Sequence, residues 1–417
     1  MVSPGFPPML GGGEQYCREL SLALHKRGHQ IQVVSSNARQ EADFWRGNPA
    51  SRSPITSADE GLTVTRCPAR GLVGGRPALL AWRKGMVVLS QLGLSESALS
   101  RMAARIPPIA DLDATLDAQQ PDVIHAFNLS WEGPMMAARR LSRRLGAPLV
   151  LTPFTHLGNG PGDRVALNST MTHQLAALRA ADAVLALTSV EAEQLADLGI
   201  APDRIHTVGG GLVPPSPPPD AEERARILEQ LRVETPYALF IGRVTRDKGA
   251  LDCMAAIEQS FRSGITLALV GAFSPEARRA HARLSPAARE RVRLLGAVDE
   301  RIKQTLLAET EMLLLPSRVE SFGIVLLEAW HHGKPVVAAR AGGLPGVVHD
   351  GENGLMVPPG DIGALATAIE RLLSDQPLAH RLGQNGRAGL VDYAWPAVAE
   401  RVESAYRAAL AACRDRH

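Results

Sequence analysis

Short apolar runs alternate along the chain with longer segments in which hydrophobic residues recur at helical spacing. This alternation predicts βαβ units, whose strands pair into parallel sheets covered by helices. The runs that predict buried strands lie at residues 31–35, 123–125, 149–152 and 184–187 in a first half, and at 237–241, 266–270, 291–295, 312–315 and 335–339 in a second half. We therefore expect an α/β protein with two Rossmann-like parallel sheets.

A proline-rich segment, Leu212 to Asp220 (LVPPSPPPD), separates the two halves. Proline fixes φ and removes a backbone donor, so this segment should be an extended, stiff connector. We expect an N-terminal domain over residues 1–213, a C-terminal domain over 220–395, and a helix over 396–417 that packs back on the N-terminal domain. Only Met1 to Ser3 precede Pro4 and the glycine-rich turn, so the usual first strand is either a stub or begins upstream.

The composition indicates a globular protein and gives no sign of a nucleic-acid partner, a metal site or a disulfide framework. Hydrophobic residues make up 45% and charged residues 21%, which is typical of a globular protein, and a net charge of +2 gives no reason to expect nucleic acid as a partner. Four scattered cysteines indicate neither a metal site nor a disulfide framework. The start of the chain lacks the features of a signal peptide, and no run of eighteen apolar residues occurs, so we expect a cytoplasmic protein.

Residues 61–110 depart from this balance, with seven basic residues against Glu96 alone. Apolar side chains between Leu79 and Val88 surround Arg83 and Lys84 there. A basic segment with apolar neighbours can contact an anionic membrane surface or a lipid-linked acceptor, whereas the ordinary interpretation is a solvated helix face. Contact with the inner face of a membrane is therefore one hypothesis for this stretch.

Two glycine-containing turns are candidates for ligand binding. Gly11, Gly12 and Gly13 directly precede a predicted helix that runs to about Lys26, and free amides at a helix start favour an anion or a sugar oxygen. The segment GRVTRDKG, residues 242–249, follows a predicted strand. It carries Arg243 and Lys248 at the carboxyl end of that strand, where open α/β sheets bind ligands, and two converging cations suit a diphosphate.

A third segment, PSRVESFGIVLLEAWHHGKPVVA, places Glu320 in a loop and Glu328 on a helix predicted from about Phe322 to His332. Two carboxylates about two turns apart can hold two parts of an elongated ligand, and a carboxylate accepts paired hydrogen bonds from vicinal hydroxyls. The amides at the helix start suit a phosphate. The alternative is that Glu320 caps the helix and Glu328 is an exposed helix carboxylate.

Nine segments in chain order form one pattern: PGFPPMLGGGE, LHKRGHQIQVV, PDVIHAF, TPFTH, ADAVLALTSVEAEQL, GRVTRDKG, PSRVESFGIVLLEAWHHGKPVVA, AGGLPGVVHDGENGLMVPPGD and YAWPAVAERVESAY. In this pattern, which spans nearly the whole chain, the sequence resembles the retaining glycosyltransferases of family four, glycosyl transferases group 1. These enzymes have the GT-B fold, in which two Rossmann-like domains face a central cleft.

The resemblance implies roles for the candidate residues. Arg243 and Lys248 would clamp the diphosphate of the donor, and Glu328 would bind the hydroxyls of its ribose. Glu320 and the backbone amides after it would bind the transferred sugar. Those amides belong to Phe322, Gly323 and Ile324.

The resemblance also implies contributions from the N-terminal domain. Gly12 and Gly13 would approach the donor from that side, and His156 would lie beside the sugar. The implied reaction moves a hexose-type sugar from a nucleoside-diphosphate sugar to a hydroxyl of a sugar, polysaccharide or lipid-linked acceptor, without a cofactor. The sequence departs from the family pattern at its short first strand, at Gly346 and at residues 209–211, where Gly-Gly-Gly replaces Asn-Gly.

Three other histidines invite simpler interpretations. His125 ends a predicted buried strand, which favours a hydrogen-bonded core histidine over a catalytic one. His331 and His332 are adjacent on a predicted helix, where they face different ways, so a metal pair is not expected. In contrast, His156 follows a strand in a polar loop, a place where a rigid scaffold often carries functional residues.

Retention of configuration can proceed through a covalent sugar intermediate or by attack on the face that the diphosphate leaves. No carboxylate pair is placed as a nucleophile, so we favour the second route, with Arg243 and Lys248 stabilising the departing charge in place of a metal ion. A metal-dependent transferase would need an Asp-x-Asp pair; Asp111 and Asp113 match these letters but lie on a predicted helix, where residues two apart diverge. A non-catalytic sugar-nucleotide-binding protein remains the alternative function. A dehydrogenase fingerprint is absent, and Lys334 is followed by proline rather than by the Ser or Thr of a P-loop.

Overall fold

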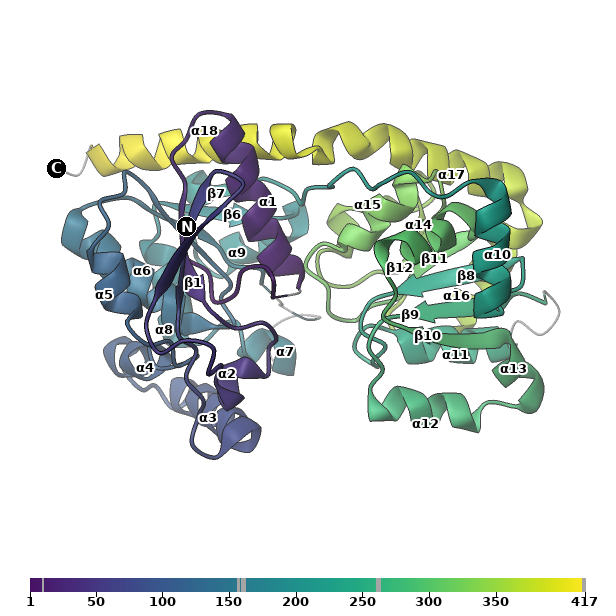
Figure 1. The fold of residues 1–417 in the computed structure, drawn as a ribbon, viewed down its shortest axis with the longest axis horizontal. Coiled ribbons are helices and arrows are strands. Elements are labelled where there is room, and N and C mark those ends of the chain that lie inside the picture. Colours follow the sequence, from purple (N-terminus) through teal and green to yellow (C-terminus); the bar gives the residue numbers. More distant parts are fainter. Residues whose placement is uncertain (10, 156–157, 159–162, 260–263, 415–417) are drawn as a thin grey trace. The chain divides into compact units, whose positions relative to one another are not determined.

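The computed structural model describes residues 1–9, 11–155, 158, 163–259 and 264–414. The chain forms two compact units (Figure 1). The first combines Met1–Gly211 with Trp395–His417, and the second is Leu212–Ala394. The chain therefore leaves the first unit at Gly211 and returns to it at Trp395.

The sheet of the first unit has two groups of strands joined by the N-terminal residues. Strands β4 (Ile124–Phe127), β5 (Leu149–Thr152), β6 (Ala183–Ala186) and β7 (Ile205–Thr207) pair in parallel. In the other group, β1 (Gln32–Ser36) is parallel to β3 (Leu62–Cys67), which pairs antiparallel with β2 (Ile55–Asp59). Val2 bridges Val34 on one side and Ala126 on the other. The stub strand considered from the sequence thus lies in the middle of this sheet.

Helices cover the first unit's parallel strands, and every residue of β4, β5 and β6 is buried, as expected for a sheet packed on both faces. The helices that precede the second unit are α1 (Gly12–Lys26), α2 (Asp43–Arg46), α3 (Gly75–Gln91), α4 (Glu96–Ala103), α5 (Leu112–Asp117), α6 (Glu132–Leu145), α7 (Arg164–Leu167), α8 (Thr172–Ala180), α9 (Ser189–Asp197) and the 3₁₀ helix η1 (Pro202–Arg204).

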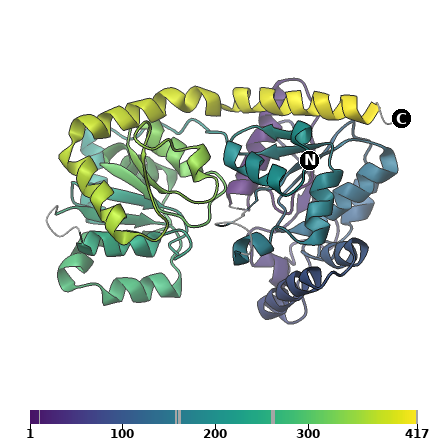
Figure 2. The same cartoon turned by 180° about the vertical axis from the view of Figure 1, so that it is seen from behind.

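The C-terminal helix α18 (Trp395–Arg414) completes the first unit, where it contacts α1, β5, β6 and β7 (yellow in Figures 1 and 2). Glu403 of α18 accepts hydrogen bonds from Nε and Nη2 of Arg27, at 2.9 and 2.8 Å, and lies 2.8 Å from His29 Nε2. Val398 and Val402 are fully buried. The last helix is therefore part of this unit's core and not an appendage.

The β2–β3 hairpin and β7 were not predicted from the sequence. All residues of β2 except Asp59 are exposed, and β7 has no buried residue, so neither shows the apolar run on which the prediction depended. The short strand β13 (Leu355–Val357) of the second unit was missed because it has only three residues, although all are buried. The predicted strands agree with observed ones, with ends shifted by one or two residues.

The second unit contains one six-stranded sheet in the order β10-β9-β8-β11-β12-β13. All five neighbouring pairs are parallel. The order reverses between β8 and β11, and such a switch point is where open parallel sheets bind ligands beyond the carboxyl ends of the strands. Besides β13, the strands are β8 (Tyr237–Ile241), β9 (Thr266–Val270), β10 (Val292–Gly296), β11 (Met312–Leu315) and β12 (Val336–Ala339).

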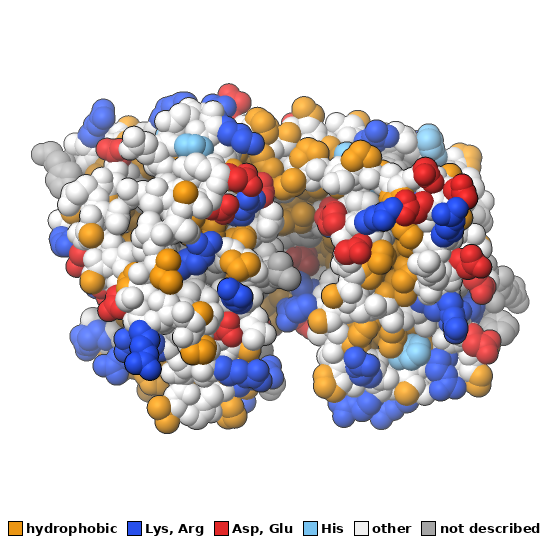
Figure 3. Space-filling view, in the orientation of Figure 1, with side chains coloured by type: hydrophobic (Ala, Val, Ile, Leu, Met, Phe, Trp, Pro, Cys, Tyr) orange, Lys and Arg blue, Asp and Glu red, His pale blue; other side chains and the backbone are white. Residues whose placement is uncertain are grey.

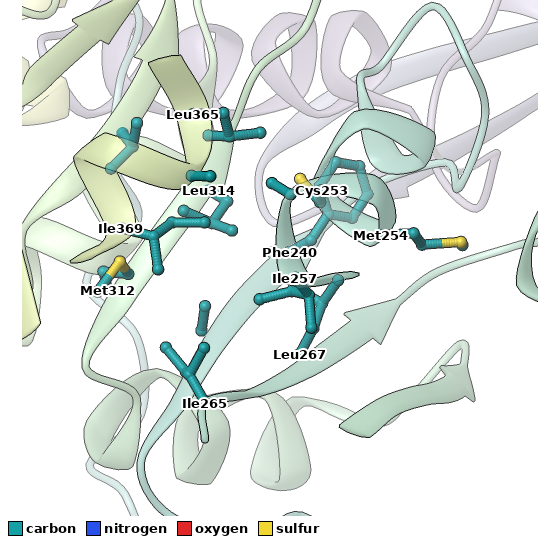
Figure 4. Packing of buried hydrophobic residues seen from close by; sticks show 14 of the residues in the cluster. Phe240, Cys253, Met254, Ile257, Ile265, Leu267, Met312, Leu314, Leu365 and Ile369 are labelled. Atoms are coloured by element: carbon teal, nitrogen blue, oxygen red, sulfur yellow. The ribbon is translucent and has the colours of Figure 1, made fainter. Parts of the chain in front are cut away.

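Helices and sheet of the second unit enclose a continuous apolar core, in which Phe240, Ile257, Leu267 and Leu314 have no exposed surface (Figure 4). This packing fixes the strand ends from which the candidate site is built. The helices are α10 (Ala221–Leu231), α11 (Ala250–Gln259), α12 (Pro275–Arg283), α13 (Pro286–Arg291), α14 (Glu300–Glu309), α15 (Ile324–His331), α16 (Ile362–Ser374) and α17 (Gln376–Ala388), with the 3₁₀ helices η2 (Leu344–Gly346) and η3 (Gly389–Tyr393).

Candidate functional site

The turn between β8 and α11 is fixed against the segment that follows β11. Gly249 has φ 77°, and a Cβ there would lie 2.1 Å from the carbonyl oxygen of Pro316, so only glycine permits this approach. The backbone N–H of Arg318 donates to Asp247 O at 2.8 Å, and its Nη1 donates to Arg246 O at 3.0 Å. These contacts bring the GRVTRDKG turn and the PSRVESFG loop together.

This packing places two of the predicted site residues in direct contact. Lys248 Nζ donates to Glu320 Oε2 at 2.9 Å and to the carbonyl oxygen of Val319 at 2.9 Å. The side chains are 17% and 19% exposed, so both are accessible and partly shielded from water. A partly desolvated ammonium beside a carboxylate can bind an anionic group and a hydroxyl next to each other.

Arg243 lies differently. Its side chain is 65% exposed, and Nη2 is 3.7 Å from Asp247 Oδ2. An exposed pair at this separation contributes little to the fold, so the guanidinium can reorient toward a ligand at small cost. The convergence of Arg243 and Lys248 on one diphosphate stays a prediction.

The start of α15 leaves backbone donors open. The helix begins at Ile324, two residues later than predicted, because Gly323 takes φ 84° at the N-cap position. Phe322 is buried, and its ring packs edge-on against Tyr393 at 5.5 Å between centroids. Among the residues that the structure describes, the amides of Phe322, Gly323 and Ile324 have no hydrogen-bond acceptor. Open amides at a helix start favour an anionic or sugar oxygen.

Glu320 and Glu328 do not fit the simpler alternatives considered for them. The N-cap of α15 is Gly323, and no side chain caps this helix, so Glu320 is not a capping residue. Its backbone is fixed instead, since Gly343 N donates to Glu320 O at 2.8 Å. Glu328 is only 19% exposed, and Lys303 Nζ of α14 donates to its Oε1 at 2.7 Å. Sequence reasoning missed Lys303, although the scarcity of lysine, five residues against forty arginines, was a usable signal.

The glycine-rich turn of the first unit has one open position. A Cβ added at Gly12 would meet nothing within 4 Å. At Gly13 it would lie 3.1 Å from the Phe154 ring, and at Gly11 it would lie 2.1 Å from Glu14 Oε2. A side chain at Gly11 would displace the flexible end of Glu14, and one at Gly13 would press on the Phe154 ring, whereas Gly12 leaves room for a ligand to approach the backbone at the start of α1.

A buried carboxylate holds Thr155, the last described residue of the TPFTH segment. Glu191 is 3% exposed, and its Oε1 accepts from the backbone N–H and the hydroxyl of Thr155 at 2.9 and 2.5 Å. Its Oε2 accepts from the amide of Leu187 at 2.7 Å. The run Thr188-Ser-Val-Glu191 is a capping-box signature that could have revealed this residue from the sequence. His156, the predicted site histidine, lies outside the described residues.

His125 and Asp113 both have side-chain partners within the fold. His125 is a buried core histidine, as predicted, with Nδ1 2.7 Å from Tyr406 Oη and Nε2 2.7 Å from Thr152 Oγ1. Burial, together with the nearby N-terminal ammonium, holds the pKa of His125 well below its usual range. Asp113 pairs with Arg140 at 2.6 Å. No cluster of three potential metal ligands occurs within residues 1–9, 11–155, 158, 163–259 and 264–414.

The two units and the site residues define the class of protein. The fold is similar to sucrose-phosphate synthase from Thermosynechococcus elongatus, with a TM-score of 0.73 and 24% identity over 96% of this chain and 94% of that chain. It is also similar to the Anabaena protein HepE in complex with UDP-glucose, with a TM-score of 0.67 and 19% identity over 96% and 97% of the two chains. The predicted fold class, GT-B, is confirmed.

Sequence comparison gives the family. Residues 222–389 match the glycosyl transferases group 1, and residues 11–211 match the glycosyl transferase 4-like domain. A D-inositol 3-phosphate glycosyltransferase from Xylanimonas cellulosilytica is 30% identical over 414 residues, covering 95% of this chain and 91% of the relative. An alpha-maltose-1-phosphate synthase from Mycolicibacterium smegmatis is 30% identical over 330 residues, covering 72% and 82%. The chain belongs to the glycosyl transferases of group 1, as the motifs predicted, and is a glycosyltransferase that uses a nucleotide-sugar donor.

The helices do not include a candidate membrane span among the described residues. Within the described part of the chain, none combines the length and the apolar character that crossing a bilayer requires.

Proposed function

We propose that this glycosyltransferase transfers a hexose from a nucleoside-diphosphate hexose with retention of configuration and without a metal ion. The observation that supports this most is the Lys248–Glu320 pair beside the open amides that begin α15. The ammonium suits the diphosphate, and Glu320 and the amides suit the sugar. The Anabaena neighbour is described with UDP-glucose and Arabidopsis starch synthase IV with ADP, which supports this donor class.

In the proposed reaction, the bond between the anomeric carbon and the diphosphate oxygen breaks while the acceptor hydroxyl attacks from the same face. The hydroxyl proton passes to the departing phosphate oxygen, so no protein base is needed. Negative charge grows on the diphosphate as the bond breaks, and Lys248 and Arg243 stabilise it more than they stabilise the bound donor. Two cationic side chains thereby take the role that a divalent cation has in metal-dependent transferases.

Incubation with UDP-, GDP- and ADP-hexoses and a panel of sugar acceptors, including D-inositol 3-phosphate, tests this proposal. We expect a product with the donor's anomeric configuration by NMR, and undiminished turnover in EDTA. An inverted product would contradict retention, and activity that EDTA abolishes and manganese restores would contradict metal independence. Donor binding without transfer or hydrolysis would instead support the alternative, a sugar-nucleotide-binding protein.

We further propose that α3 contacts an anionic membrane surface that presents the acceptor. Leu80 and Val88 of α3 are 50% and 51% exposed, and Lys84 is exposed between them. Basic and hydrophobic side chains lie together over the lower part of the first unit, where Figure 1 places α2 to α4 (Figure 3). Arg83 is not available for this contact, because it pairs with buried Glu132 at 2.5 Å.

Flotation with vesicles of phosphatidylcholine alone and with phosphatidylglycerol added tests the membrane contact. We expect binding to the anionic vesicles only, and weaker binding for Lys84→Glu. Equal flotation with both kinds of vesicle, or none with either, would contradict the proposed contact.

A further inference from the structure

The second glutamate of the candidate site also has a lysine partner. Lys303 Nζ donates to Glu328 Oε1 at 2.7 Å and lies 3.0 Å from Glu300 Oε2. Among the residues that the structure describes, none donates to Oε2 of Glu328. One carboxylate oxygen is therefore held, and the other can accept from a ligand.

This pair differs from the exposed ion pair on the same helix. The side chains of Lys303 and Glu328 are 20% and 19% exposed, whereas Arg301, which pairs with Glu223, is 62% exposed. Burial opposes the charge on Lys303, but the carboxylates of Glu328 and Glu300 outweigh it, so the pKa of Lys303 is raised. Lys303 thus stays charged in a partly desolvated position, where electrostatic contacts are stronger than at the surface.

We infer that Lys303 is a positioning residue for nucleotide recognition: it holds Glu328 by Oε1 so that Oε2 accepts from the ribose 2′-hydroxyl. This inference rests on the proposed function, which gives Glu328 the ribose. Lysine suits this role because it is a compact charge that contacts one oxygen and retains further N–H donors. The guanidinium of arginine would cover both carboxylate oxygens in a bidentate pair and compete with the ribose.

Calorimetry with UDP, GDP and ADP, each beside its 2′-deoxy counterpart, tests the inference. For the nucleotide that the wild type binds, we expect Lys303→Met to weaken affinity about tenfold, the effect of one lost hydrogen bond to a charged group. The affinity for the 2′-deoxy nucleotide should fall much less in this variant, because that nucleotide lacks the 2′-hydroxyl. Lys303→Arg should not restore ribonucleotide affinity, whereas Arg301→Met, the matched control on α14, should bind like the wild type.

The outcomes separate this inference from the proposed function. If the wild type binds none of the six nucleotides, the proposed function itself fails. If it binds one and Glu328→Gln weakens that binding, but Lys303→Met does not, only the positioning role is wrong. Equal losses for the ribo- and 2′-deoxynucleotides, or full restoration by Lys303→Arg, would show a general structural or electrostatic effect and overturn the inference. Thermal unfolding checks that each variant is folded, and Lys303→Gln replaces Lys303→Met if the latter is not.

Discussion

The two units use their glutamates differently. In the second unit, Glu320 and Glu328 are each 19% exposed and paired with a lysine. In the first, Glu132 and Glu191 are 1% and 3% exposed and accept hydrogen bonds from groups of the fold itself. A ligand can replace a lysine as the partner of a partly exposed carboxylate. A buried carboxylate, in contrast, cannot give up its hydrogen-bond donors without a large cost in free energy.

We expect this difference to separate carboxylates that bind a ligand, in the second unit, from carboxylates that stabilise the fold, in the first. Glu191 joins the TPFT segment to the start of α9 through three hydrogen bonds, and burial raises its pKa although those hydrogen bonds oppose the rise. Among the described candidate residues, the first unit has open backbone at Gly12, whereas the second has partly exposed charged side chains. Substitutions should therefore reduce stability in the first unit and activity in the second.

The largest effect on activity is expected for Lys248→Ala. Losing a cation that stabilises the departing diphosphate should cost about 2 to 4 kcal/mol of barrier, by analogy with the loss of one oxyanion donor. Arg243→Ala should act in the same direction. Steady-state kinetics measures this, with Arg246→Ala as the control, since Arg246 is an exposed neighbour that pairs with Glu276. A Lys248→Ala enzyme with normal kcat would contradict the expectation that the charged side chains of the second unit determine activity.

For stability, Glu191→Ala should be the most damaging of these changes. The substitution removes the acceptor of three buried hydrogen bonds, from the backbone N–H and hydroxyl of Thr155 and from the amide of Leu187, which should lower the free energy of unfolding by roughly 2 to 3 kcal/mol. Urea denaturation gives this value, and Glu193→Ala, an exposed change on the same helix, should stay within about 0.5 kcal/mol of the wild type. Unchanged stability with lost turnover would mean that the first unit also has a binding carboxylate.

A smaller effect should divide the roles of the second unit's two glutamates. Glu328→Gln should weaken the binding of both the nucleotide-sugar and the free nucleoside diphosphate by about 1 to 2 kcal/mol, because both ligands contain the ribose. Glu320→Gln should impair transfer but spare diphosphate affinity, because its expected contact is the sugar alone. Calorimetry distinguishes the two, and equal loss of diphosphate binding in both variants would refute this division.

The smallest effect concerns pH and the contact of α18 with α1. The hydrogen bonds from Arg27, with that of His29, lower the pKa of Glu403 to about 2. Its value in the unfolded chain is about 4.3, so this stabilisation is present above that pH and is lost as the pH falls toward 2. Glu403→Gln should therefore reduce the melting temperature at pH 6 but much less near pH 2. The same reduction at both values would show that its charge is not what stabilises the contact.

Sequence reasoning predicted the parts whose pattern is local. The alternation of buried runs predicted the parallel strands, and the nine motifs predicted the family and the fold. Strand prediction failed where the sequence has no apolar run, as for the exposed strand β2. The partners of Glu320 and Glu328 were also missed, because Lys248 and Lys303 come from other segments and their pairing depends on how β8, β11, α14 and α15 pack.

The return of the chain to the first unit has a consequence for how the protein is made. Residues 1–211 leave the ribosome first, yet the surface that Trp395, Val398 and Val402 cover in the finished unit stays bare until the last helix emerges. Domains fold as units during synthesis, so the second unit can fold before α18 has been synthesised, whereas the first unit cannot complete its core until then. A premature stop that removes only α18 would therefore leave the apolar surface that α18 covers exposed to chaperones and proteases.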